Sequence, residues 1–345
     1  MYSTIKDIPF TDLYLGMDMH TRLMKGNGVG RGVRPVPEEY HEDCTVLLST
    51  TISLEQEKKR PEFSVSHDGL MYRVAKIPSV GGVLFHYRRA QIEPKSLQSL
   101  NIDPINIAKM KDLGKSHNGG LSLVIGGYGE GKSTTAATMF KEWMIENGGV
   151  GVALESPVEF PLAGTHGDAL CLQIEVPEDE VGRAIEDQKR WAPNYMFLGE
   201  IRKAESANQL ISAANSNLNC VATLHGGDIS QGVTSLVRFA NRDQQEEVAK
   251  NIANCISAFI HIRLVDRVDP KSGVAIKVPE IRALYVTDEN RAQVRVALEK
   301  GNYQQLDEMA KVQRQSLQKT QPVQHMQPRQ AAMASMAAPA ARIGG

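Results

Sequence analysis

The sequence predicts an α/β protein in which a small α+β domain precedes a larger domain built on a parallel sheet. From residue 105 onward, apolar runs of strand length alternate with helical segments, which is typical of a parallel sheet with crossover helices. A glycine-rich loop of the phosphate-binding pattern lies between a strand and a helix of this region, at residues 126–133. Before residue 100, two alternating runs meet at the turn His67-Asp68-Gly69, which indicates an antiparallel hairpin.

The composition limits the classes of protein to which the chain can belong. Of its 345 residues, 41% are hydrophobic and 23% are charged, and the formal net charge is −1. No basic field favours nucleic acid, so no stable nucleic-acid binding is expected. No apolar run is long enough to span a bilayer, and Met1–Asp7 has no apolar core, so neither a membrane span nor a signal peptide is expected. The four cysteines form no C-x-x-C pair, which suits a reducing compartment and argues against a zinc site or a disulfide framework.

The first domain is expected at residues 1–100, followed by a linker to residue 104. Residues 45–48 lie in a helix or a strand, and periodicity leaves both open. The stretch Gly26–Gly32 is only superficially like a dinucleotide fingerprint, because Pro35 and Pro37 follow it and no helix can open there. A flexible hairpin loop is expected instead. Strands are expected at residues 11–15, 63–66, 70–77 and 83–89.

The second domain is expected at residues 105–313, with a helical cap over residues 288–311. From residue 314 to 345 the chain is rich in Gln, Ala, Met and Pro and has no acidic or aromatic residue, so this tail is expected to be disordered. A turn is expected at residues 269–273. Helices are expected at residues 105–113, 134–144, 179–191, 203–216 and 244–258. Strands are expected at residues 121–125, 150–154, 174–176, 195–198, 220–224, 259–264 and 274–278.

The glycine-rich loop fits the pattern G-x-x-x-x-G-K-[ST] without a mismatch. Glycines allow a tight turn whose backbone N–H groups point at phosphate oxygens, and the helix that follows adds the positive end of its dipole. In such a loop Lys132 bridges the β- and γ-phosphates, and the hydroxyl of Ser133 binds Mg²⁺. The expected nucleotide-binding residues are Gly126, Gly127, Tyr128, Gly129, Glu130, Gly131, Lys132, Ser133 and Thr134.

Polar side chains follow three other predicted strands where each strand ends. Glu200 follows the strand 195–198, His225 follows the strand 220–224, and Glu159 lies shortly after the strand 150–154. The carboxyl ends of neighbouring parallel strands meet beside the γ-phosphate, where a ligand of Mg²⁺ or a water-polarising base is needed. By chemistry alone Glu155 is as good a candidate as Glu159, so both remain open at this point.

Four ordered blocks resemble the traffic ATPases of type IV secretion, plasmid conjugation and type IV pilus retraction. They are the phosphate loop 126–133, an acidic box at 155–160, a Walker B block at 197–202 and a histidine box at 223–225. Residues 173–176 also resemble a segment of the family. In the first domain, residues 12–15, 72–74 and 87–88 resemble the PAS-like domain that precedes the motor. The resemblance extends from residue 1 to about 310 and implies a PAS-like α+β domain followed by a RecA-like P-loop NTPase domain.

This resemblance also implies roles for individual residues. Glu159 would polarise the attacking water, Glu200 would support Mg²⁺ partly through water, and His225 would sense the γ-phosphate. Arg73 and Arg88 would reach the ATP of a neighbouring subunit. The implied protein binds ATP and Mg²⁺, forms a homo-hexamer and docks on an inner-membrane platform. It would be cytoplasmic and peripheral to the membrane.

Several positions depart from the family pattern. Ser156 and Asn194 stand where aspartate is usual, Lys203 replaces an aspartate, and Glu186 stands where arginine is common. Residues 290–295 only loosely resemble the segment associated with pilus retraction. A four-cysteine module is missing, which argues against the pilus-assembly and type II secretion branch.

These departures favour a type IV secretion or conjugation motor, with pilus retraction as the alternative. A nucleic-acid translocase is less favoured because the chain has no basic stripe. An inactive nucleotide-binding scaffold is disfavoured because Lys132, Glu159 and Glu200 are all present.

Overall fold

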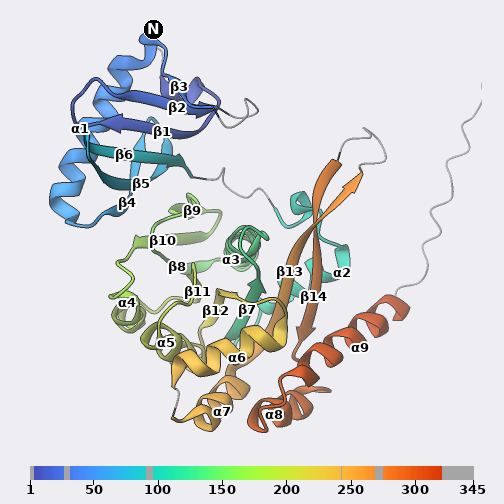
Figure 1. Ribbon diagram of the computed structural model, residues 1–345. Coiled ribbons are helices and arrows are strands. Elements are labelled where there is room, and N and C mark those ends of the chain that lie inside the picture. Colours follow the sequence, from blue (N-terminus) through green and yellow to red (C-terminus); the bar gives the residue numbers. More distant parts are fainter. Residues whose placement is uncertain (1–3, 27–31, 91–95, 242, 269–274, 321–345) are drawn as a thin grey trace, which may run out of the picture.

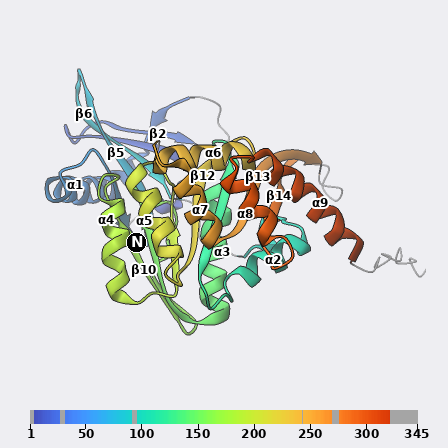
Figure 2. The same ribbon diagram turned by 90° about the horizontal axis from the view of Figure 1, so that it is seen from below.

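Two sheets, one in each of two successive domains, organise the chain (Figure 1). The structure is a computed structural model that describes residues 4–26, 32–90, 96–241, 243–268 and 275–320. Most of the loop expected at 26–32, the turn expected at 269–273 and residues 321–345 of the expected tail therefore lie outside the described residues. Seen from below, the first domain and helices α8 and α9 lie at opposite ends of the molecule (Figure 2).

The first domain is an antiparallel sheet packed against one long helix. Its strand order is β3-β2-β1-β6-β5-β4, and every neighbouring pair is antiparallel. Residues 45–48 fall within α1, which settles the open choice in favour of a helix. Apolar side chains such as Leu47, Phe63 and Phe85 are buried between helix and sheet. The elements are the short 3₁₀ helices η1 (Ile5–Asp7) and η2 (Glu38–Tyr40), helix α1 (His41–Lys58), and strands β1 (Phe10–Gly16), β2 (Arg22–Gly26), β3 (Arg34–Pro35), β4 (Glu62–His67), β5 (Leu70–Ser79) and β6 (Gly82–Arg89).

The second domain has an eight-stranded sheet in the order β14-β13-β7-β12-β11-β8-β10-β9. Its six inner strands run parallel, and the edge strands β14 and β9 are antiparallel to their neighbours. The strands are β7 (Gly120–Gly126), β8 (Gly149–Glu155), β9 (Gly164–His166), β10 (Ala169–Glu175), β11 (Tyr195–Leu198), β12 (Asn219–His225), β13 (Ile256–Val268) and β14 (Ala275–Tyr285).

Helices cover both faces of this sheet, as the alternation of strand and helix predicts. In β7, Leu123 and Ile125 face one hydrophobic core, and Val124 between them faces the other. The first core is shared with α4 (Val181–Gln188), α5 (Ala204–Ala214), α6 (Ile229–Ala240), α7 (Gln245–Cys255), α8 (Arg291–Glu299) and α9 (Gln304–Thr320). The second core is shared with α2 (Pro104–Leu113) and α3 (Lys132–Asn147).

The structure differs from the expected elements in a few places. Helix α6 and strand β9 were not expected, and β10, β13 and β14 are longer than expected. The helix expected at 179–191 ends at Gln188 and continues as the 3₁₀ turn η4 (Lys189–Trp191). Helix α7 ends at Cys255, because the apolar stretch from Ile256 joins the sheet beside β7. Residues 314–320, assigned to the disordered tail, instead continue α9, because Gln, Arg, Leu and Lys are good helix formers.

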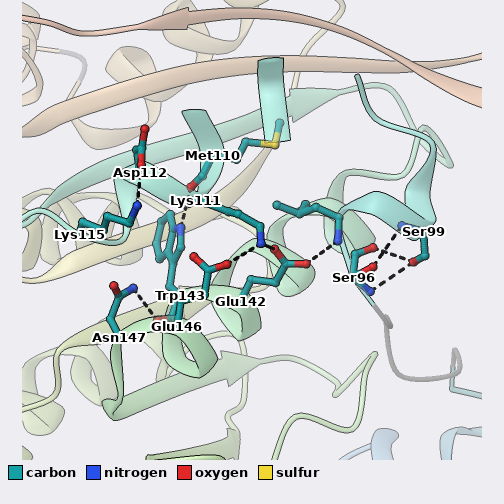
Figure 3. A network of polar contacts seen from close by, with 11 residues as sticks. Ser96, Ser99, Met110, Lys111, Asp112, Lys115, Glu142, Trp143, Glu146 and Asn147 are labelled. Carbon is teal, nitrogen blue, oxygen red and sulfur yellow. Dashed lines mark hydrogen bonds and ion pairs between the residues drawn. The ribbon is translucent and has the colours of Figure 1, made fainter. Parts of the chain in front are cut away.

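The end of the interdomain linker is fixed to the helix that follows the phosphate loop (Figure 3). Leu97 is fully buried, and its N–H donates to the carboxylate of Glu142 on α3 at 2.6 Å. Lys111 of α2 pairs with the same carboxylate at 3.1 Å, and the indole of Trp143 donates to the carbonyl oxygen of Met110 at 2.7 Å. Residues 98–100 form the 3₁₀ helix η3 (Gln98–Leu100). Part of the stretch expected as a linker is therefore folded onto the second domain.

Candidate active site

The phosphate loop joins the buried strand β7 to helix α3, as its sequence pattern predicts. Gly129 and Gly131 have φ angles of 74° and 84°, in the left-handed region that favours glycine. A Cβ atom at Gly126 would lie 2.5 Å from the carbonyl oxygen of Ile262 on β13, so only glycine fits there. Helix α3 begins at Lys132, and Ser133 and Thr134 lie in its first turn. The orphan N–H groups of this turn provide donors for a phosphate.

Lys132 lies folded against the loop that it belongs to. Its ammonium group donates to the carbonyl oxygen of Gly127 at 2.7 Å. Burial lowers the pKa of Lys132, while three nearby carboxylates act in the opposite direction. Two of those carboxylates belong to Glu159 and Glu200, so the lysine and both candidate glutamates share one electrostatic environment.

A pocket beside the loop gathers the expected acidic residues at the carboxyl ends of the strands. Ser133 lines it from α3, Glu155 and Glu159 line it from the end of β8 and the loop that follows, and Glu200 lines it just after β11. Arg202 contributes to the same wall and pairs with Glu200 at 2.6 Å. The structure thus brings together the residues expected to bind Mg²⁺ and to activate water.

His225 lies between the phosphate loop and the strand end that carries Glu200, because β12 lies between β7 and β11 in the sheet. It ends β12, which lies next to β7, and its Nδ1 donates to the carbonyl oxygen of Gly126 at 2.9 Å. Gly226 donates to the same oxygen at 3.3 Å. His225 is therefore tied to the start of the phosphate loop, while Glu159 and Glu200 lie in the pocket.

An arginine of the first domain reaches this site within the same chain. Arg73 on β5 pairs with Glu159 at 2.8 Å, and both side chains are about one third exposed. The family resemblance implies that Arg73 reaches the ATP of a neighbouring subunit; in this chain Arg73 lies against its own acidic box. Arg88 instead pairs with Asp12 of the first domain at 3.0 Å, so the chain does not bring it to the same pocket.

Further contacts hold the first domain beside the acidic box. The hydroxyl of Ser64 on β4 accepts a hydrogen bond from the N–H of Val158 at 3.1 Å. Lys58 and Arg60 both pair with Glu175 at the end of β10, at 2.5 and 3.0 Å. These contacts place β4 and β5 at the edge of the sheet that carries the candidate catalytic residues.

The structure gives two residues contacts that the sequence did not predict. Glu130 was expected at the nucleotide, and Gln173 was assigned no role. The carboxylate of Glu130 accepts a hydrogen bond from the N–H of Leu264 on β13. Gln173 on β10 contacts both Glu155 and the acidic-box loop, and its sequence signal is its place in the family-like segment 173–176. Tyr128 at the tip of the phosphate loop is 91% exposed.

The donor set of the pocket fits Mg²⁺ bound together with a nucleotide. Magnesium prefers hard oxygen ligands and is usually bound by one or two protein groups plus substrate phosphates and water. Ser133 and Glu200 supply a hydroxyl and a carboxylate at the pocket. Within the described ranges, no group of three or more His, Cys, Asp and Glu side chains forms a metal cage by itself. The residues therefore fit a cation held jointly with phosphate.

A phosphate loop at the carboxyl end of an inner parallel strand, with acidic residues at the carboxyl ends of nearby strands, defines the class of P-loop nucleotide-binding proteins. Within that class, the chain belongs to the Type II/IV secretion system protein family, whose model matches residues 56–338. This match extends past residue 310, where the resemblance stated from the sequence ended. No helix in the described part of the chain combines the length and apolar character that a membrane crossing requires.

Known relatives support this membership. The type IV pilus ATPase PilU of Pseudomonas aeruginosa is 25% identical over 238 residues, which cover 66% of this chain and 60% of PilU. The chain thus spans less than two thirds of that relative. Among solved structures, the pilus retraction motor PilT with bound ADP aligns with a TM-score of 0.69 at 22% identity, covering 89% of this chain and 87% of PilT. The ATPase DotB of Legionella pneumophila aligns with a TM-score of 0.64 at 19% identity, covering 91% and 85%. The solved structures of PilT and DotB therefore share the fold of this chain.

Proposed function

We propose that this chain is a motor ATPase that powers a type IV secretion or plasmid conjugation apparatus at the inner membrane. In this proposal it works as a cytoplasmic homo-hexamer docked on a membrane platform. The observation that carries the proposal is the pocket in which Ser133, Glu159 and Glu200 meet. Arg73 of the first domain pairs with Glu159 at this pocket. A site that spans two domains links a change at the phosphate to a movement between the domains.

The chemical step follows from the positions of the side chains. The N–H groups of the phosphate loop and Lys132 hold the β- and γ-phosphates of ATP. Glu159 would accept the proton of the attacking water. Ser133 and Glu200, the latter partly through water, would hold Mg²⁺, which would supply positive charge at the phosphate oxygens. His225, whose Nδ1 donates to the carbonyl oxygen of Gly126, would sense the γ-phosphate.

Arg73 connects this step to the first domain. Its guanidinium group pairs with Glu159, so one cation neutralises the proposed base. A γ-phosphate beside Glu159 offers the guanidinium a second and more highly charged partner. Transfer of Arg73 to the phosphate would free the Glu159 carboxylate to act on water and would draw β5 toward the nucleotide. The first domain then moves with each cycle of binding and hydrolysis.

The choice of apparatus rests on the departures from the family pattern. Ser156, Asn194, Lys203 and Glu186 weaken the likeness to a retraction motor and leave the nucleotide chemistry intact. A second candidate is a type IV pilus motor, which the similarity to PilU favours. A nucleic-acid translocase is less favoured, since the net charge of −1 provides no field that attracts phosphate backbones.

The test is the ATPase rate against protein concentration, with the molar mass followed by light scattering. We expect the rate per chain to rise as the hexamer forms. Glu159→Gln should lower kcat at least about 100-fold while ATP still binds. Glu180→Gln, at an exposed position outside the pocket, is the matched control and should keep the full rate. A monomer that hydrolyses ATP at the rate of the hexamer would overturn the proposal of a shared motor.

A further inference from the structure

We infer that Glu155 and Gln173 form a brace that positions Glu159 for hydrolysis, so both are positioning residues of this site. This inference rests on the assignment of Glu159 in the proposed function. It assigns to Glu155 a role other than that of the water-activating base. The two side chains come from neighbouring parallel strands, β8 and β10, and together they hold the loop of residues 156–163 that carries Glu159.

The register of the two strands brings the side chains together. Gln173 pairs with Ala153 and Glu175 pairs with Glu155, so Gln173 and Glu155 are diagonal neighbours on one face of the sheet. The amide of Gln173 donates to Oε1 of Glu155 at 2.6 Å. The pairing of β8 with β10 therefore fixes the positions of both residues.

Glu155 holds the loop at the catalytic candidate itself. Its Oε2 accepts the backbone N–H of Glu159 at 3.0 Å. Glu155 is 3% exposed, and burial raises its pKa to about 7. A carboxylate is a costly group at so buried a position, and an apolar residue would avoid that cost. What the carboxylate provides is a pair of acceptors, one for Glu159 and one for Gln173.

Gln173 holds the remainder of the same loop. Its amide nitrogen also donates to the carbonyl oxygen of Phe160 at 2.6 Å. Its oxygen accepts the N–H groups of Leu162 and Ala163, at 2.9 and 3.1 Å. One side chain thus satisfies three backbone groups of a short loop that has no strand partner of its own. Glu159 is held between this clamp and Glu155.

The experiment is a double-mutant cycle with Glu155→Gln, Gln173→Glu and the exchanged pair. In Glu155→Gln, only one oxygen remains for two N–H donors. In Gln173→Glu, two carboxylates face each other in a buried site. The exchanged pair restores part of the fit, because the amide at 155 donates to the carboxylate at 173 and its oxygen still accepts from Glu159. The carboxylate at 173 still accepts from Leu162 and Ala163, but its other oxygen now faces the carbonyl oxygen of Phe160, so the fit is restored only in part.

We expect each single variant to lower kcat about 10- to 100-fold, as for a displaced catalytic group. The dissociation constant for ATP, measured by equilibrium binding, should stay within about twofold, because the hydrogen bonds of Glu155 and Gln173 join them to each other and to residues 159–163. The exchanged pair should recover part of the lost kcat and be faster than either single variant. The thermal unfolding midpoint is measured for every variant, and Glu180→Gln serves as the exposed control. Recovery of kcat by the exchange is a readout that simple destabilisation by two substitutions would not give.

Failure of the brace can be told from failure of the proposed function. If Glu159→Gln keeps the full rate, the catalytic assignment is wrong and the brace has no function to support. If Glu159→Gln is inactive while Glu155→Gln and Gln173→Glu keep kcat, only the brace is refuted. The brace is also refuted if the single variants lose ATP binding in parallel with kcat, or if the exchanged pair is slower than both.

Discussion

At the scale of single residues, the carboxyl of Glu155 is buried and accepts from two neutral donors, the N–H of Glu159 and the amide of Gln173. Burial raises its pKa from the ordinary 4.5 to about 7. Between these values the folded protein holds a proton that the unfolded chain has lost. The free energy of unfolding therefore falls as pH rises from about 4.5 to about 7, by up to about 3 kcal/mol from this residue alone.

Glu155→Gln should remove this contribution. We expect the urea unfolding free energy of the variant to depend less on pH between 5 and 8 than that of the wild type. The two proteins are compared by the slope of their unfolding free energy against pH. The absolute values are not compared, because the substitution also removes a hydrogen bond at every pH. Parallel slopes for the two proteins would mean that Glu155 ionises normally in the folded state.

Lys132 gives a second test at this scale. Lys132 is the only cationic residue of the loop 126–133, and we expect its ammonium group to leave the carbonyl oxygen of Gly127 for the phosphates when ATP binds. Lys132→Ala should weaken ATP binding at least about tenfold, measured by fluorescence titration with a labelled nucleotide. Lys141, on the same helix α3 and outside the loop, provides the control Lys141→Ala, which should bind normally. Equal binding by both variants would contradict the assignment of the loop.

At the scale of elements, the contact between α3 and the end of the linker depends on Glu142. Removing its carboxylate leaves the buried N–H of Leu97 without its partner and Lys111 with only Glu146. We expect Glu142→Ala to lower the free energy of unfolding by about 1–3 kcal/mol. Glu146→Ala removes the more exposed partner of Lys111 and should cost under about 1 kcal/mol. The unfolding free energies of the two variants are compared by urea unfolding. Equal losses of free energy would mean that the buried contact contributes no more to stability than the exposed one.

The sequence predicted elements well where local pattern and tertiary packing agree. Strand β7 and helix α3 are examples, because an apolar run, a glycine loop and good helix formers follow in order. Helix α6 was missed because Gly232, Val233 and Thr234 are poor helix formers. Its signal was nevertheless present, since Ile229, Val233, Leu236 and Val237 recur at helical spacing and are buried.

Side-chain partners were harder to predict than elements. Glu159 and Glu200 follow from their places at strand ends, and the structure brings both to one pocket. The pairing of Arg73 with Glu159 joins residues far apart in sequence, and no local pattern encodes it. The brace by Gln173 depends on the register of β10 against β8, which only the assembled sheet fixes.

At the scale of the whole molecule, Glu175 is the anchor of the first domain. Its side chain is 10% exposed and pairs with both Lys58 and Arg60. Glu175→Gln should loosen the contact between the domains, because the two cations lose their shared anion. We expect a larger radius of gyration by small-angle X-ray scattering and a lower ATPase rate. Raised salt should produce the same change in the wild type, and unchanged scattering for Glu175→Gln would contradict this role.

The fixed position of Leu97 sets a limit on how far the first domain can travel. Strand β6 ends at Arg89, and the chain is bound again to α3 at Leu97. Even fully stretched, the intervening residues measure at most roughly 25–30 Å. The first domain is thus tied to the second by a short linker. The fixed end of this linker, at Leu97, is bound to helix α3, which begins with Lys132. In the proposed motor, the first domain can therefore only turn about that point, and the length of the linker bounds the distance that one ATP could move a load.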